Sequence, residues 1–271
     1  MTQPLASKLK VLITRPEEKG RALALQLNKR GIEAFCHVFF DYEPRATKPY
    51  ICEQVQQCAD VIVIFVSVAA VIYAHKTYPI SHWHNKYFIA VGDATKLALA
   101  ALTTQTILCP KIHTSEGVLA LPILQQVSNK NIIIVRGDGG REYLKDTLEA
   151  RKAKVTYIES YQKVWRTLSK NIVKKWQAQQ INCIVVTSNA LLEQIMRLLD
   201  AFIETNATND KSQNDTLRYV LHLKNTCLWV VASKRIADNA QRLGLVHIVN
   251  ANGANDQAIM ASLQTTVSFS Q

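Results

Sequence analysis

The chain has 271 residues, which is the length of one large domain or two small ones. Hydrophobic residues make up 48% and charged residues 20%, a globular composition that excludes a disordered chain. The 32 lysines and arginines against 21 acidic residues give a formal net charge of +11. That excess predicts an anionic partner, which leaves nucleic acid, anionic lipid and a polycarboxylate or phosphate metabolite open.

Short β-branched runs alternate with longer amphipathic runs along the chain. Most of the ten expected strands are nearly continuous apolar segments, as in parallel strands that are buried on both faces. These strands are Lys10–Thr14, Ile32–Cys36, Val61–Phe65, Tyr87–Ala90, Thr106–Leu108, Asn131–Val135, Lys154–Ile158, Cys183–Thr187, Cys227–Val231 and Val246–Val249. The expected helices between them include Glu17–Arg30, Thr95–Leu102, Glu116–Gln126, Glu142–Lys152, Ala190–Ile203 and Arg235–Leu243. We therefore predict an α/β fold with two doubly wound, flavodoxin-like parallel sheets of five strands each.

Parts of the sequence echo one another weakly. Val11–Arg15 resembles Ile132–Arg136, and Val61–Ser67 resembles Cys183–Ser188. Each of the first two segments is followed by a helix, a strand and then a tyrosine, Tyr42 or Tyr161. Two copies of one α/β unit would explain the ordered echoes, although any two strand–helix units look somewhat alike.

Two segments, residues 38–45 and 159–166, are aromatic and charged instead of apolar. They bracket the middle five strands, so we expect them to be two adjacent crossings that form a two-stranded β-ladder linker. Residues 1–37 and 167–271 would then form one discontinuous domain, with residues 46–158 inserted as the second. The polar stretch Glu204–Tyr219 is expected to be an exposed loop insertion.

Ligands of open parallel sheets bind beyond the carboxyl ends of the strands, beside helix N-termini that favour anions. The residues expected there are mostly hydroxyl, glycine and cationic residues, which suit an oxygen-rich anion. Each serine or threonine could instead be a helix N-cap, each arginine a salt-bridge partner, and the glycines a tight turn. The candidate binding residues are Arg15, Ser67, Thr95, Ser115, Arg136, Gly137, Gly139, Ser188 and Ser233.

Other kinds of site are not indicated. The glycine cluster that starts at Gly137 is neither a dinucleotide fingerprint nor a Walker loop. The six cysteines contain no C-x-x-C pair, and His75, His82 and His84 lack a third ligand at helical spacing, so we expect no metal site. Aromatic residues do not alternate with a basic stripe, which argues against a nucleic-acid partner.

Cellular location follows from the same inventory. The apolar run Val61–Ala74 is too short to span a bilayer, and Met1–Lys10 holds no apolar signal segment. Scattered free thiols fit a reducing compartment. We expect a cytoplasmic protein with no membrane partner.

The stretch Val135–Leu144, followed by Leu148, Val155 and Glu159–Tyr161, resembles a pattern of the uroporphyrinogen-III synthase family. That pattern is Arg-Gly-x-Gly-Gly-Arg-Glu, leading to an interdomain tyrosine. Further matches run in family order along the chain. They are Ile13–Pro16, Val66–Val71, Ala90–Thr95, Thr114–Gly117 and Thr187–Leu191. The turn Val231–Arg235 departs from the pattern because it lacks the glycine that Gly92 supplies in the other domain, although Ser233 could substitute.

The resemblance implies two α/β domains joined by a β-ladder, with the active site in a cleft between them. It implies a cofactor-independent lyase that acts on hydroxymethylbilane, a linear tetrapyrrole polycarboxylate. We expect the protein to be a monomer. Such an enzyme removes water, inverts the terminal pyrrole ring through a spiro intermediate and closes the macrocycle to uroporphyrinogen III, a step of haem biosynthesis. Positioning and preorganised dipoles can supply much of that catalysis.

Residue roles also follow from the resemblance. Tyr161 matches the family's candidate general acid, which would assist departure of the hydroxyl; it could instead only pack the linker. Ser67, Thr95 and Ser188 are expected to contact substrate carboxylates, together with backbone N–H groups. The alternative function is a non-catalytic two-domain α/β protein that binds or senses an anion.

Overall fold

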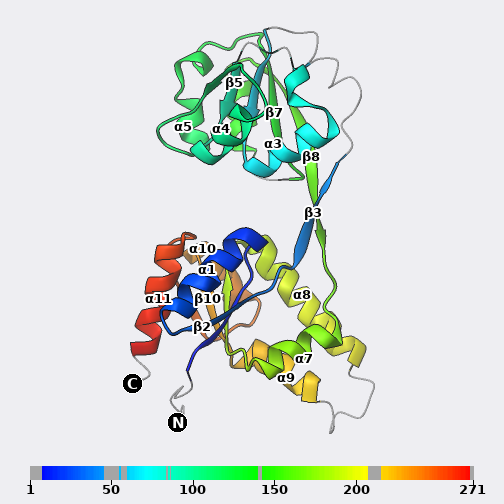
Figure 1. Ribbon diagram of the computed structural model, residues 1–271, viewed down its shortest axis with the longest axis vertical. Helices are drawn as coiled ribbons and strands as arrows, with labels where there is room; N and C mark the ends of the chain where they lie inside the picture. Colours follow the sequence, from blue (N-terminus) through cyan, green and yellow to red (C-terminus); the bar gives the residue numbers. More distant parts are fainter. Residues whose placement is uncertain are drawn as a thin grey trace. The chain divides into compact units, whose positions relative to one another are not determined.

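The computed structural model describes residues 8–45, 55, 60–83, 85, 87–139, 142–206 and 215–268. The chain splits into two compact units: unit 1 is Met1–Phe40 with Trp165–Gln271, and unit 2 is Asp41–Val164. Both boundaries fall inside the segments 38–45 and 159–166 that the sequence analysis expected to join two domains. Each unit contains one sheet with helices on both of its faces (Figure 1).

Unit 1 is built on a five-stranded sheet in which every neighbouring pair of strands is parallel. Its strands are β1 (Lys10–Ile13), β2 (Glu33–Cys36), β9 (Cys183–Val186), β10 (Leu228–Val231) and β11 (Ile248–Asn250). Its helices are α1 (Glu17–Lys29), α7 (Lys170–Ala178), α8 (Asn189–Asn206), α9 (Asp215–Asn225), α10 (Lys234–Arg242) and α11 (Asp256–Ser268). Side chains of α1 and α11 pack with Val11 and Ile13 in one buried cluster, and α7, α8 and α9 lie on the other side of the sheet (Figure 1).

Unit 2 is built on a six-stranded sheet. Its strands are β3 (Phe40–Pro44), β4 (Ile62–Phe65), β5 (Tyr87–Ala90), β6 (Thr106–Leu108), β7 (Asn131–Gly137) and β8 (Lys154–Trp165). Its helices are α3 (Val68–Thr77), α4 (Asp93–Ala100), α5 (Ser115–Leu119) and α6 (Tyr143–Ala150), with short 3₁₀ turns at Ile80–His82 and Pro122–Leu124.

Strand β4 shows why the unit 2 sheet is covered on both faces. Its side chains alternate: Val63 and Phe65 pack with α3 and α4, whereas Ile62 and Ile64 pack with α5 and α6. All four are buried, so a continuous apolar run satisfies two cores at once, as expected for a central parallel strand. The two doubly wound sheets, in which every pair is parallel except that of β3 with β8, agree with the fold class predicted from the sequence.

The strand orders support the internal repeat. Unit 1 has the order β2-β1-β9-β10-β11, and unit 2 continues from its edge strand β3 as β8-β7-β4-β5-β6. The two orders match if β7 and β8 take the places of β1 and β2. If the strands of unit 1 are numbered 1 to 5 along the chain, their order in the sheet is 2-1-3-4-5, the flavodoxin-like arrangement. The strands β8-β7-β4-β5-β6 of unit 2 have the same spatial order, but the chain begins with β4, at the third position, and reaches the first two positions last.

The edge strand β3 pairs with β8, which makes the second sheet one strand larger than the five expected. The Arg45 backbone N–H donates to the Ser160 carbonyl (3.0 Å) and the Arg166 N–H donates to that of Phe39 (2.8 Å), so the two strands run antiparallel. Strand β8 does not stop at Ile158 but continues to Trp165. One long strand therefore belongs both to the buried sheet and to the crossing segment.

Several helices differ from the sequence expectation. Residues Glu116–Gln126 do not form one helix, because α5 ends at Leu119 and Pro122, which has no N–H to donate, starts a 3₁₀ turn. The expected loop Glu204–Tyr219 is helical at both ends, in α8 and α9, and residues 207–214 lie outside the described chain. Helices α3, α7, α9 and α11 are not among the helices that the sequence analysis named. No described helix is long and apolar enough to cross a membrane.

Candidate active site

A β-bulge positions Tyr161 at the carboxyl edge of the unit 2 sheet. Strand β8 pairs in register with β7 up to Arg136 opposite Glu159, but the next pair is Gly137 opposite Tyr161. Ser160 is the extra residue, fully buried, and its hydroxyl donates to the carbonyls of Ala70 (3.1 Å) and Arg136 (3.3 Å). Because side chains alternate along a strand, the bulge turns the Tyr161 ring to the face that carries Ile158.

Gly137 is what allows the Tyr161 ring to lie against β7. A Cβ atom added at Gly137 would come within 2.5 Å of the ring carbons Cε2 and Cζ and 2.9 Å of the phenol oxygen. The turn that follows is tied to the same residue, since the Asp138 N–H donates to the Tyr161 carbonyl at 2.8 Å. Gly139 has φ +68°, a left-handed conformation that favours glycine. The glycines thus fix the ring and the turn together.

The Tyr161 phenol meets the start of α3. Its oxygen lies 3.4 Å from the Ser67 hydroxyl oxygen, and Ser67 is the N-cap of α3, accepting the Ala70 N–H at 3.1 Å. The Tyr161 ring also packs edge-on against Tyr42 (4.8 Å between centroids) and beside Tyr73 (5.6 Å). The Tyr161 ring thus packs in an aromatic cluster, as a linker residue would, and its hydroxyl lies at the sheet edge, as a general acid would.

The three tyrosines of this cluster are not equivalent. Burial, with the neighbouring Tyr161 and Tyr73 as smaller causes, raises the pKa of Tyr42 to about 12. The Tyr73 hydroxyl donates to the Tyr42 carbonyl at 2.7 Å, so its proton is already engaged by the backbone. Of the three, Tyr161 is the one whose hydroxyl lies beside the capping serine.

Arg136 lies at the end of β7 in a network of its own. The buried guanidinium contacts Glu142 (Nη1–Oε1, 2.9 Å) and Glu159 (Nη2–Oε1, 3.5 Å) and stacks on the Tyr157 ring at 3.5 Å from its centroid. The Tyr157 hydroxyl donates to the other Glu142 oxygen at 2.7 Å. These hydrogen bonds from Tyr157 and Arg136 lower the pKa of Glu142. The salt-bridge alternative for Arg136 is what the structure contains.

The remaining unit 2 candidates lie at the same edge but differ in local role. Thr95 is buried in the first turn of α4, whose N-cap is Gly92. Ser115 is the first residue of α5, and its predecessor Thr114 is the side-chain cap, accepting the Gly117 N–H at 3.2 Å. The N-cap explanation therefore holds for Ser67 and does not hold for Thr95 or Ser115.

The unit 1 candidates lie at the carboxyl edge of the unit 1 sheet. Arg15 follows β1, is buried, and forms an ion pair with Asp256 in the first turn of α11. Ser188 is exposed, and its hydroxyl accepts the Leu191 N–H at 3.3 Å at the start of α8. Ser233 is the N-cap residue of α10, but its side chain makes no capping hydrogen bond. Arg15 and Arg136 occupy matching positions of the repeat, and each is paired with carboxylates.

The sequence analysis did not identify the partners that hold these residues. Tyr73, Tyr157 and Asp256 were not singled out, because none lies in a motif and each reaches the site from another element. The Glu142 carboxylate had a signal, since it follows Arg136 within the glycine-arginine stretch. The Arg141 of that stretch lies outside the described residues.

Comparison with known proteins identifies the family. The family model of uroporphyrinogen-III synthase HemD matches residues 21–261. The uroporphyrinogen-III synthase of Escherichia coli K12 is 30% identical over 264 residues, which covers 94% of this chain and all of the relative. The Proteus mirabilis uroporphyrinogen-III synthase is 28% identical and covers 69% of this chain and 98% of its own length.

Solved structures agree at the level of the fold. The uroporphyrinogen-III synthetase of Helicobacter pylori aligns with a TM-score of 0.58 over 96% of this chain and 99% of its own, at 10% identity. A mutant uroporphyrinogen III synthase of Thermus thermophilus aligns with a TM-score of 0.50 over 96% and 99%, at 13% identity. Nothing in these comparisons favours the alternative of a non-catalytic anion sensor. The chain belongs to the uroporphyrinogen-III synthase family.

Proposed function

We propose that this protein converts hydroxymethylbilane to uroporphyrinogen III in tetrapyrrole biosynthesis. Its membership of the family over residues 21–261 carries the proposal. The position of the Tyr161 hydroxyl, beside Ser67 at a carboxyl sheet edge, supports it. The substrate's terminal hydroxyl leaves as water, the terminal pyrrole ring is inverted through a spiro intermediate, and a carbon–carbon bond closes the macrocycle.

Tyr161 is the proposed general acid. A phenol that donates a hydrogen bond or a proton to the departing hydroxyl makes it a better leaving group. The Ser67 hydroxyl, which lies 3.4 Å from the phenol oxygen, can orient the Tyr161 hydroxyl or accept its hydrogen bond before substrate arrives. The close contact with Gly137 holds the ring in one place. The conformational entropy of orienting the acid is therefore lost when the protein folds and not when the substrate reacts.

Substrate carboxylates are proposed to bind at the carboxyl sheet edge of each unit. Helix N-termini at those edges offer unpaired backbone N–H groups and a favourable dipole. The proposed contacts in unit 2 are Ser67, Thr95, Ser115, Gly137 and Gly139, and those in unit 1 are Ser188 and Ser233. Arg15 and Arg136 add positive charge, but each already holds a carboxylate of the protein. A substrate carboxylate at either arginine would share or displace that partner.

The proposed reaction class is that of a cofactor-independent lyase. Loss of water and ring closure change no net oxidation state, so the reaction as written calls for no electron carrier. Elimination and rearrangement depend instead on an acid and on the conformation imposed on a flexible chain. We further propose that the enzyme acts as a cytoplasmic monomer with no nucleic-acid partner. Free thiols at Cys36, Cys109, Cys183 and Cys227 support a reducing compartment.

Isomer analysis tests the function directly. Uncatalysed closure of hydroxymethylbilane gives the uninverted isomer, uroporphyrinogen I. Purified protein incubated with hydroxymethylbilane is expected to give the inverted isomer III, separated after oxidation by liquid chromatography. Heat-denatured protein is the control. If only isomer I forms, at the rate of the control, the proposed function is wrong.

A further inference from the structure

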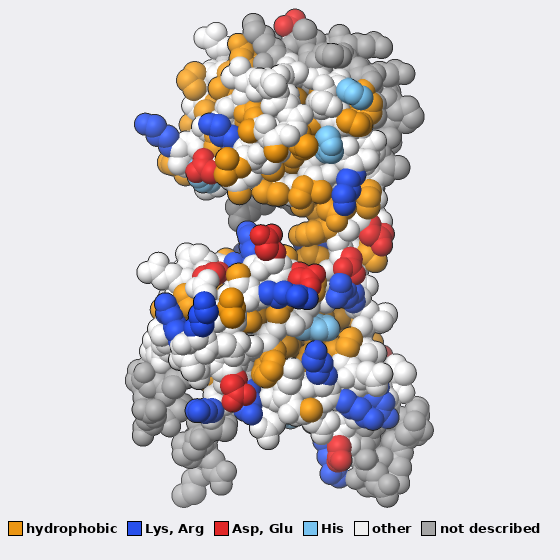
Figure 2. Space-filling model, viewed as in Figure 1, with side chains coloured by type: hydrophobic (Ala, Val, Ile, Leu, Met, Phe, Trp, Pro, Cys, Tyr) orange, Lys and Arg blue, Asp and Glu red, His pale blue; other side chains and the backbone are white. Residues whose placement is uncertain are grey.

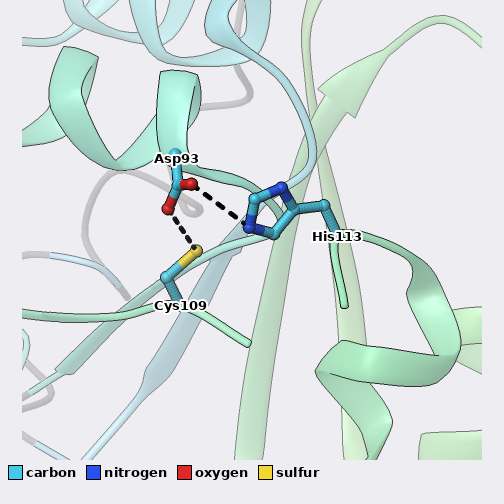
Figure 3. Close-up of side chains that lie close together, drawn as sticks. All are labelled: Asp93, Cys109 and His113. Carbon is cyan, nitrogen blue, oxygen red and sulfur yellow. Dashed lines mark hydrogen bonds and ion pairs between the residues drawn. The ribbon is translucent and has the colours of Figure 1, made fainter. Parts of the chain in front are cut away.

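Three side chains that commonly bind metal ions lie together in unit 2, outside the residues proposed for catalysis. Asp93 is the first residue of α4, Cys109 directly follows β6, and His113 precedes the cap of α5. Their ligand atoms all lie within 4.8 Å of one another. Figure 3 shows the Asp93 carboxylate between the other two, with one oxygen toward each.

The spacing of these atoms can be compared with that of a tetrahedral site. Zinc bonds of about 2.3 Å to sulfur and about 2.0–2.1 Å to nitrogen and oxygen place neighbouring ligand atoms roughly 3.3–3.6 Å apart. His113 Nε2 lies 3.5 Å from Asp93 Oδ2, and Cys109 Sγ lies 3.8 Å from Asp93 Oδ1. The two side chains face different oxygens of the carboxylate, and with one ligand atom per residue the three atoms lie within 4.8 Å of one another. Rotation of side chains that are exposed or half-buried would have to shorten the remaining distances by roughly 1 Å to reach tetrahedral spacing.

The backbone also supports this arrangement. Gly92 leaves space for the imidazole: a Cβ atom added there would lie 3.3 Å from His113 Cγ and 3.5 Å from Nδ1. Pro110 follows Cys109 directly and restricts the backbone on the loop that carries both Cys109 and His113. One side of the imidazole thus lies against the start of α4, where Asp93 lies, while the side chain stays exposed.

The donor set selects among metal ions. One sulfur, one imidazole nitrogen and one carboxylate oxygen suit a borderline-soft ion such as Zn²⁺, and do not suit Mg²⁺ or Ca²⁺, which prefer oxygen ligands alone. Three protein ligands leave one tetrahedral position for water or an exogenous carboxylate. On binding, the Cys109 thiol loses its proton to solvent, because the thiolate is the ligand.

We propose that Asp93, Cys109 and His113 form a binding site for Zn²⁺ or a similar thiophilic divalent cation. The ion would link the loops that follow β5 and β6 and so stabilise the folded protein. The sequence analysis expected no metal because it looked for ligands at short regular spacing. These three residues are far apart in that sense and come together only where the segments after β5 and β6 lie side by side in the folded unit. The proposal does not depend on the proposed catalytic function, because it concerns binding alone.

Cobalt(II) is the probe for this site, since it takes the place of zinc and reports its ligands spectroscopically. Metal-free full-length protein titrated with CoCl₂ is expected to bind one ion per chain, with a thiolate-to-cobalt charge-transfer band and visible bands of four-coordinate intensity. Zn²⁺ is expected to displace the cobalt and to raise Tm. Cys109→Ser is expected to abolish the charge-transfer band, and His113→Gln to weaken binding by roughly tenfold or more.

Cys36→Ser is the matched control, because Cys36 is also a free, half-buried thiol but lies in β2 of unit 1. It is expected to bind cobalt as the wild type does. Circular dichroism of each metal-free variant checks that folding is intact. No saturable binding by the wild type, a charge-transfer band that persists in Cys109→Ser, or its loss in Cys36→Ser would each overturn the proposal.

Discussion

Tyr161 satisfies two constraints that a purely structural tyrosine would not need to meet together. Its ring is fixed from one side by Gly137 and from others by Tyr42 and Tyr73, while its hydroxyl lies beside the Ser67 hydroxyl. Ring packing stabilises a fold whatever the position of the oxygen. The position of the oxygen at a sheet edge, beside a capping hydroxyl, is what the proposed acid requires.

Removing only that oxygen separates the two roles. Tyr161→Phe keeps the ring contacts, so Tm is expected to stay near the wild-type value. If the phenol assists hydroxyl departure, kcat is expected to fall by roughly 10²-fold or more. The measurement is single-turnover or steady-state formation of isomer III from hydroxymethylbilane.

Tyr42→Phe is the matched control for this prediction. Tyr42 packs on the same ring, and the repeat places it similarly, but its hydroxyl is not the one beside Ser67. We expect its kcat to change little. Equal losses of rate in the two Phe variants, or none in either, would remove Tyr161 as the specific acid. Tyr161→Ala is expected to lose stability as well as activity, because it also leaves a cavity.

Gly137 gives a second test at the residue scale. In Gly137→Ala the new methyl group lies 2.5 Å from ring carbons of Tyr161, so the ring or β7 has to move. Overpacking of this kind costs roughly 1–3 kcal/mol of unfolding free energy, and displacement of the phenol is expected to lower kcat further than the loss of stability explains. Unfolding in denaturant and kcat are measured on the same preparation.

Gly31→Ala separates backbone strain from displacement of the ring. Gly31 has φ +79° with nothing within 4 Å of an added Cβ, so alanine there is strained but touches no functional group. A loss of roughly 1–2 kcal/mol with unchanged kcat is expected. If both alanine variants lower kcat alike, the Gly137 effect is one of general stability.

At the scale of elements, much of the sheet architecture could be predicted from the sequence. Runs such as Ile132–Val135 are apolar at consecutive positions, and this pattern reveals a strand that is buried on both faces of a sheet. The bulge at Ser160 could not be predicted, because a one-residue shift in register depends on the partner strand and on hydrogen bonds to Ala70 and Arg136. The orientation of Tyr161 depends on that shift.

The same limit explains the errors in the helices and the site. Helix α3 lies within an apolar run that continues from β4, so its sequence has little polar contrast to reveal a helical period. The pairing of Arg15 with Asp256 joins residues 241 positions apart, and a single sequence contains no signal for such a contact. The residue types at the strand ends were predictable; their partners were not.

The segment that joins β2 to β3 supplies a pH-dependent test. His37 packs edge-on against Phe39 (4.7 Å) and Trp176 (5.0 Å), within unit 1. Burial, and then the positive charges of Arg166 and Lys175, lower the pKa of His37 to about 4. The unfolded chain takes up this proton near its ordinary pKa of 6.5, so the unfolding free energy is expected to fall as pH falls from 6.5 to 4 and not to change above that range.

The contribution of His37 is measured as a difference between proteins. His37→Phe retains a ring in the cluster but cannot titrate, so its stability is expected to exceed that of the wild type increasingly between pH 6.5 and 4. The full difference is of the order of 2–3 kcal/mol. Denaturant unfolding across that range gives both profiles, and parallel profiles would show that His37 takes up its proton in the folded protein as in the unfolded one.

At the scale of the whole molecule, the two sheets use one strand order with different points of chain entry. Residues at matching positions therefore show which features belong to the scaffold and which to a site. Ser67 and Ser188 both cap the helix after their strand, so capping is common to both units. Only Ser67 has a tyrosine hydroxyl beside it among the described residues. Among the described residues, the edge of unit 2 therefore has a phenol hydroxyl at a position where the matching edge of unit 1 has none.

The net charge of +11 gives the last prediction. On the visible face of unit 1, Lys and Arg side chains lie at several separate places with acidic side chains among them (Figure 2). A dispersed excess of this kind attracts a polyanion over a distance instead of binding it at one contact, and salt screens this attraction with a Debye length of about 10 Å at 0.1 M.

KM for hydroxymethylbilane is therefore expected to rise steadily with ionic strength. The constant kcat is expected to change little, because it describes the reaction of substrate that is already bound. Steady-state kinetics from low to high KCl measure both constants, and Tm in the same buffers excludes unfolding as the cause. A KM that stays flat across this range would mean that the positive charge has no part in substrate capture.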